Sequence, residues 1–217
     1  LFLLILCVGG GFVSAAECPA EQDTLLSALS AQLRRNFKTL KKLRPPVYYM
    51  SYQLYETSAF QANAKAGALQ FSITDDSGAV DISARVGSVH TDNTHELKGT
   101  YTNTDLISVQ VPLARRNSLA LRNALWRGTQ SAVENAQQEY NRVLSNKQVS
   151  AENMDTSDDF ALPQKNVFCQ EEKTFEYNRA EIEERLKRLS LQGEKYDFVD
   201  DSAYAFRLER INTYFVD

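Results

Sequence analysis

The chain has 217 residues, 43% of them apolar and 24% charged, a globular composition that suits one large domain or two small ones. A formal net charge of −4 and a pI near 5.4 remove any general electrostatic reason to expect nucleic-acid binding. The basic residues that gather between Arg34 and Arg44 are expected to form a solvated helix face.

Residues 1 to 16, LFLLILCVGGGFVSAA, form an apolar run that ends in small residues. Cleavage after Ala15 or Ala16 would fit a signal-peptidase site, and the run is too short to be a membrane span. No initiator Met or basic segment precedes it, so we expect a partial signal peptide at 1–16. The remaining residues, 17–217, are expected to form one secreted or periplasmic domain without a stable membrane span.

Removal of the signal peptide would leave two cysteines, Cys18 and Cys169. In an oxidising compartment these could form one disulfide that ties the N-terminus to a late segment, or they could remain two thiols. Neither lies in a C-x-x-C arrangement, so the sequence does not support a structural zinc site or a redox role.

The first half of the mature chain changes from a helical to a strand pattern. Apolar residues at three- and four-residue spacing predict an amphipathic helix over 21–44, ended by Pro45-Pro46. Alternation over 48–55, 69–73 and 80–86 predicts three strands, with TDDSG (74–78) as a turn between the last two. We therefore expect an antiparallel meander with one buried face.

The second half predicts further helices around the sheet. A polar stretch at 88–105 favours a loop, and a short strand is expected at 107–111. Asn117 or Ser118 could cap a long helix whose inner side carries Leu121, Leu125, Thr129, Ala132, Ala136, Tyr140 and Val143. Trp126 is expected at the contact between this helix and the sheet.

The last third begins with an acidic connector and ends in strands. Residues 145–161 are expected to be mobile or to form a substrate-proximal flap, and a plain linker is the preferred interpretation. Asn178 and Glu181 form a capping box that opens a helix ended by Gly193, and strands are expected at 204–208 and 211–217. The fold class predicted is α+β, an antiparallel β-sheet meander packed against long amphipathic helices.

Both histidines lie in HTDNTH, residues 90–95. Zinc enzymes usually place two histidines three or four residues apart on a helix, whereas His90 and His95 are five apart and would point in different directions on a helix or a strand. We expect a polar turn in which Asp92 and Asn93 bond to the backbone. The alternative is a metal site formed by a loop.

Other chemical motifs are missing from the sequence. It contains no G-x-S-x-G, no glycine-rich phosphate loop and no H-E-x-x-H, and nothing marks a serine as the partner of either histidine. The pairs Asp75-Asp76, Asp158-Asp159 and Asp200-Asp201 are interpreted as a turn and two solvated acidic pairs. We therefore expect no catalytic, cofactor-binding or metal-binding residue in this chain.

Several stretches, taken in order, resemble the N-terminal domain of TldD/PmbA-type proteins, particularly the exported TldD-related group. They are RPPVYYMSYQLYE (44–56), GAL (67–69), ISARVGSVHTDNTH (82–95), VPL (111–113), LALRNALWRGTQSAVENA (119–136) and RINTYFVD (210–217). The chain departs from the group at Arg115 and Arg116, where acidic residues are usual, and at Gln130, where Asp is more typical.

The resemblance implies a non-catalytic N-terminal domain, truncated at residue 217, of an exported zinc metallopeptidase that acts on small or unfolded peptides. The zinc would lie in the missing C-terminal domain, on a His-Glu-x-x-x-His helix that this chain does not contain. The domain would help to enclose the substrate cavity, pack against its own C-terminal domain and take part in a homo- or heterodimer. The alternative is an exported peptide-binding or scaffolding module without catalytic activity.

Overall fold

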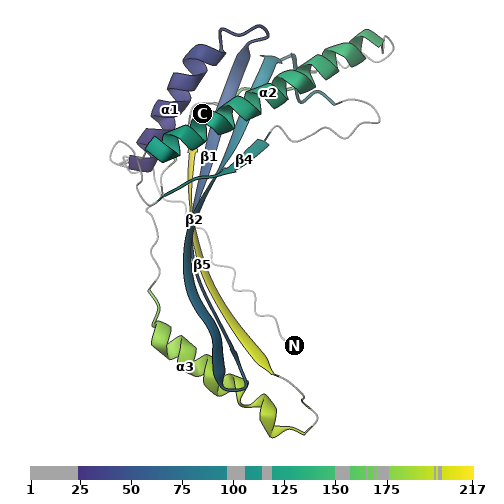
Figure 1. Cartoon of the computed structure of the whole chain (residues 1–217). Coiled ribbons are helices and arrows are strands. Elements are labelled where there is room, and N and C mark those ends of the chain that lie inside the picture. The colour runs from purple at the N-terminus through teal and green to yellow at the C-terminus, as the bar shows by residue number, and fades with distance from the viewer. Residues whose placement is uncertain are drawn as a thin grey trace.

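In this computed structural model, the residues described are 24–96, 106–113, 119–149, 157–164, 166–168, 170, 176–197, 199 and 202–217. They form a long, twisted antiparallel sheet with helices at both ends (Figure 1). The predicted α+β class is confirmed. None of the helices within these ranges combines the length and apolar character that a bilayer crossing requires.

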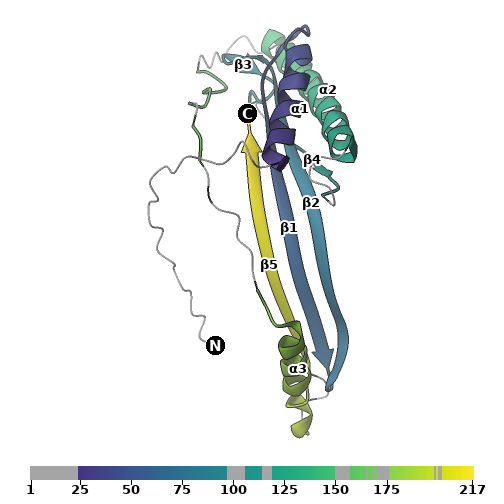
Figure 2. The ribbon, with the colours of Figure 1, turned by 90° about the vertical axis from the view of Figure 1, so that its left-hand side faces the viewer.

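Three long strands run the length of the molecule (Figure 2). β1 (Val47–Lys65) pairs with β2 (Ala68–Ser88) on one side and with β5 (Ala203–Val216) on the other. β4 (Leu106–Gln110) and the two-residue β3 (Thr91–Asp92) add to β2 near its C-terminal end. The chain thus returns to the far side of β1 after its helices, which a simple meander does not do.

The turn between β1 and β2 lies at Ala66-Gly67, and the turn predicted at TDDSG (74–78) is wrong. Both loop residues have positive φ, 49° and 76°, as the tight two-residue hairpin requires. TDDSG continues the strand, with Asp76 paired to Ser58 and Gly78 paired to Glu56. The turn prediction failed because Asp and Gly favour turns locally, whereas here an 18-pair ladder with β1 holds them extended.

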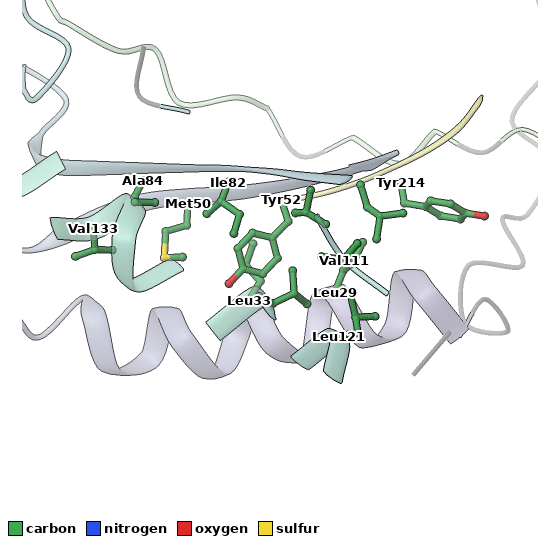
Figure 3. Packing of buried hydrophobic residues seen from close by; sticks show 14 of the residues in the cluster. Leu29, Leu33, Met50, Tyr52, Ile82, Ala84, Val111, Leu121, Val133 and Tyr214 are labelled. Carbon is green, nitrogen blue, oxygen red and sulfur yellow. The ribbon is translucent and has the colours of Figure 1, made fainter. Parts of the chain in front are cut away.

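The hydrophobic core lies at one end of the sheet, under α1 (Thr24–Leu40) and α2 (Leu119–Val149). Side chains of β1 and β2 point towards the two helices (Figure 3). α2 continues to Val149 and takes in the first residues of the linker predicted at 145–161. Its predicted inner side is confirmed, with Leu121, Leu125, Thr129, Ala132, Ala136 and Val143 buried and Tyr140 packed against the core.

A buried polar network joins the two helices to β1. The Asn36 side-chain amide donates to the Tyr52 hydroxyl at 2.9 Å and to Thr129 Oγ1 at 3.1 Å, and the two hydroxyls lie 2.6 Å apart. Gln32 donates to Asn36 Oδ1, and Thr129 donates to the Leu125 carbonyl. Each of these buried polar groups is hydrogen-bonded, so its burial does not carry the cost of an unpaired polar atom. The network therefore fixes how α1 and α2 dock on the sheet.

The other end of the sheet is covered by α3 (Arg179–Ser190), which begins at the predicted cap, where Asn178 Oδ1 accepts from the Glu181 N–H at 3.2 Å. The helix ends at Ser190, three residues before the predicted stop at Gly193, and a short 3-10 helix follows. Beneath it is a second, smaller core of Phe60, Ala62, Ala64 and Leu186. β5 is one continuous strand instead of the two predicted.

Several predictions fall outside the described residues. These are the signal peptide, Cys18 and Cys169, the capping residues Asn117 and Ser118, and the pair Asp200-Asp201.

Candidate functional site

The described helices pack on only one of the two faces of the long sheet. Even-numbered residues of β1, such as Tyr52, Leu54 and Phe60, point to the face on which the helices pack. From Tyr49 onwards, after a bulge that leaves Val47 in the core, odd-numbered residues and their cross-strand partners point to the opposite face, which we call the open face. No described helix packs on the open face, so its side chains are the natural place to look for a binding surface.

Large apolar side chains are exposed on the open face. Phe71 and Ile73 of β2 are 45% and 50% exposed, and Ile211 and Phe215 of β5 are 54% and 51% exposed. The register places them on one face, on either side of β1. They are spread along the face, from Phe71 opposite Asn63 to Phe215 opposite Gln53, so another chain would have to be extended to contact them all.

β5 is also an edge strand. Its 14 residues pair with β1 on one side, and on the other side no described strand pairs with it. An edge strand presents a row of backbone N–H and C=O groups that can pair with another extended segment. Edge and open face together form a surface suited to an extended polypeptide.

The HTDNTH segment lies at the C-terminal end of β2 and is a polar turn, as predicted. Asn93 Oδ1 accepts from the Val86 N–H at 2.7 Å, and Asp92 Oδ1 accepts from the Thr94 N–H at 2.7 Å. Asp92 and Asn93 thus satisfy backbone groups, as expected. Within the described ranges, no cluster of three or more His, Cys, Asp or Glu side chains is placed to hold a metal ion.

Asp92 is completely buried and is the centre of this turn. Its Oδ2 accepts from the Tyr48 hydroxyl at 2.5 Å and from Arg85 Nη1 at 2.8 Å, and its Oδ1 also accepts from Thr94 Oγ1 at 2.8 Å. Burial works against the charged carboxylate, but the hydrogen bonds from Tyr48, Thr94 and Arg85 outweigh it and lower the pKa of Asp92. Conversely, burial and the neighbouring Asp92 carboxylate raise the pKa of Tyr48.

Both histidines hold the Asp158-Asp159 pair, which the sequence suggested was solvated. His95 Nδ1 lies 2.6 Å from Asp159 Oδ1, with the two side chains 14% and 8% exposed. His90 Nδ1 bonds to Asp158 Oδ1 in a more exposed pair. The predicted linker 145–161 is therefore helical at its start and bonded to the turn at its end. A local sequence pattern could not show these bonds, because the partners lie some 65 residues away.

The backbone of the same segment is also tied down. The N–H groups of Asp159 and Phe160 both donate to the Val89 carbonyl, at 2.9 and 3.2 Å, and Asp159 Oδ2 accepts from the Asp92 N–H at 2.8 Å. We call residues 157–160 the acidic strap. It lies between α2 and α3 in the sequence and is hydrogen-bonded to the turn.

The Phe160 ring lies over the end of the open face. Its centroid is 4.8 Å from that of Tyr49 and 6.3 Å from that of Tyr48, and the Arg85 guanidinium carbon lies 4.0 Å from it. Tyr49 and Arg85 are cross-strand partners on the open face. The strap thus places an aromatic ring in a slot made of a cation and two tyrosines.

Trp126 does not lie at the helix–sheet contact, as the sequence suggested, but is 55% exposed on α2. The position facing the sheet is taken by Gly128, where an added Cβ would lie 2.6 Å from Ile82 Cδ1. The close approach of helix and sheet leaves no room there for an indole ring, and Trp126 is on another side of the helix.

No family model matches the chain, and no curated protein sequence matches it. Among solved structures, that of TldE from Thermococcus kodakarensis is similar to the chain, with 11% sequence identity and a TM-score of 0.44. The similarity covers 85% of this chain and 34% of TldE, so the chain spans about a third of the length of that protein. At this level of similarity, membership of the TldD/PmbA family stays a prediction from the sequence.

Proposed function

We propose that this chain is a non-catalytic domain that holds an extended peptide against the open face of its sheet. The observation that carries the proposal is the exposure of Phe71, Ile73, Ile211 and Phe215 on a face that no described helix covers. The side of β5 on which no described strand lies adds backbone groups, which bind an extended chain largely without regard to its sequence.

The motif resemblance to TldD/PmbA-type proteins supports a more specific form of the proposal. In it, the chain is the N-terminal domain of an exported metallopeptidase and encloses part of the cavity that receives small or unfolded peptides. Zinc and the catalytic groups belong to a C-terminal domain, which would be the chain's first partner. The alternative is an exported peptide-binding or scaffolding module, and the same exposed face favours it equally.

Site-specific photo-crosslinking tests peptide binding. Ile73 and Ile211 are each replaced by p-benzoylphenylalanine, and the variants are irradiated with a fluorescent unstructured peptide. Leu119, which is 73% exposed on α2, is the matched control position. We expect crosslinks from the two strand positions, suppressed by excess unlabelled peptide, and none from the helix.

Equal labelling from all three positions, or labelling that excess peptide does not suppress, would refute the proposal. The peptidase form needs a separate measurement, namely zinc content and peptide hydrolysis by the complete gene product. Stoichiometric zinc with hydrolysis would favour the metallopeptidase. Peptide crosslinking without zinc or hydrolysis would favour the binding module.

A further inference from the structure

Three residues of the acidic strap contact the turn and the open face. Asp158, Asp159 and Phe160 make these hydrogen bonds and ring contacts. Beyond them, Leu162, Val167 and Phe168 are 58%, 65% and 83% exposed. No strap residue belongs to either hydrophobic core, so breaking these contacts would leave both cores in place.

The site beneath the strap has a defined chemistry. Two imidazoles face two consecutive carboxylates, and the Nδ1 of a histidine can donate to a carboxylate whether or not the ring is charged. The Val89 carbonyl receives two backbone N–H groups, and Arg85 and Tyr49 receive an aromatic ring. The site is therefore suited to bind a short acidic sequence followed by an aromatic residue.

We propose that this site is a binding site for an acidic–aromatic peptide segment, and that the strap occupies it as a releasable internal ligand. The inference rests on the proposed function in one respect, because the site lies at the end of the open face. A peptide bound along that face could displace the strap by placing its own acidic and aromatic side chains on His95, Arg85 and Tyr49.

The strap competes with any such peptide from within the same chain. A tethered ligand has an effective concentration in the millimolar range. If the untethered strap sequence has a dissociation constant of about 100 μM for the empty site, the tethered strap would weaken the binding of a competing peptide about 10-fold or more. Removing the strap's contacts should restore the stronger binding.

The experiment compares the whole chain with a strap-release variant, Asp159→Ala/Phe160→Ala. The probe is a fluorescein-labelled Ser-Asp-Asp-Phe-Ala-Leu peptide, the sequence of residues 157–162, with binding followed by fluorescence anisotropy. A matched control, Asp76→Ala/Phe168→Ala, removes the same residue types at exposed positions outside the strap. We expect at least 10-fold tighter binding to the strap-release variant than to the wild type or the control.

Adding His95→Ala or Tyr49→Ala to the strap-release variant should abolish the gain. Equal affinity of the wild type and the strap-release variant, or a gain that survives both further substitutions, would overturn the inference. Hydrogen exchange gives a second measurement on the wild-type chain. Excess unlabelled peptide should speed exchange of the Asp159 and Phe160 amides, and no change at saturating peptide would also overturn it.

The result is independent of the crosslinking test of the proposed function. A gain on strap release without crosslinks at Ile73 and Ile211 would keep the acidic–aromatic site and reject the peptide-holding face. Crosslinks at both positions without a gain on strap release would do the reverse.

Discussion

Replacing Asp92 with alanine should destabilise the chain more than any other single change in the polar turn. The side chain is fully buried and its two oxygens accept four hydrogen bonds, from Tyr48, Arg85 and the N–H and hydroxyl of Thr94. Its loss would remove the Asp92 carboxylate from the Arg85 guanidinium, whose side chain is 16% exposed and which also donates to Thr94 Oγ1. Removing one partner of a buried ion pair costs about 3–5 kcal/mol.

Thermal unfolding followed by circular dichroism measures this effect. For a chain of this size, a loss of 1 kcal/mol lowers the Tm by about 2–4 °C, so Asp92→Ala should lower it by about 6–20 °C at pH 7. Asp75→Ala, an exposed aspartate on the open face of β2, is the control and should change stability by no more than about 0.5 kcal/mol. A Tm for Asp92→Ala within 2 °C of the wild type would refute the reasoning.

The pH dependence of the same difference tests the electrostatic cause. Hydrogen bonds lower the pKa of Asp92 in the folded chain despite its burial. Its contribution is therefore fully present above the pKa of an unfolded aspartate, about 3.9, and is lost as the pH falls through the lower folded value. The Tm gap between the wild type and Asp92→Ala should narrow below about pH 4, and a gap that widens there would contradict this account.

Three further substitutions test the packing. Tyr52→Phe removes a buried hydroxyl that bonds two partners, and should lower the free energy of unfolding by about 1–2 kcal/mol in urea titrations. Phe60→Ala empties the core beneath α3, should cost about 3–5 kcal/mol, and should speed amide exchange in that helix first. Gly67→Ala should cost about 1–3 kcal/mol, because φ is +76° and the new Cβ would lie 2.7 Å from Leu191 Cδ2.

Each of these has a matched control on the same strands. Tyr55→Phe and Phe71→Ala make the same chemical changes on the open face and should be nearly neutral. Ala66→Gly relieves a positive φ of 49° and should not destabilise the hairpin. Any control that costs as much as its test substitution would show that the burial or backbone strain described is not the cause of the effect.

The sequence by itself determined the elements whose signals are local. Apolar spacing predicted the inner side of α2 because a helix repeats every 3.6 residues. Alternation predicted the first half of β1, at 48–55, because a strand repeats every two. The Asn178 cap and the Asp92-Asn93 turn are set by bonds that span two to seven residues. These short-range rules were enough for the α+β class and for the polar turn.

Only the tertiary structure decided the features that depend on distant partners. Asp75 and Asp76 extend in β2 because β1 pairs with them, although alone they favour a turn. The linker ends in a strap because His90 and His95 lie where its carboxylates arrive. The open face exists because the described helices all pack on one side of the sheet, and that side is set by the packing of both cores. No window of the sequence contains both halves of such a contact, so no local pattern could have predicted it.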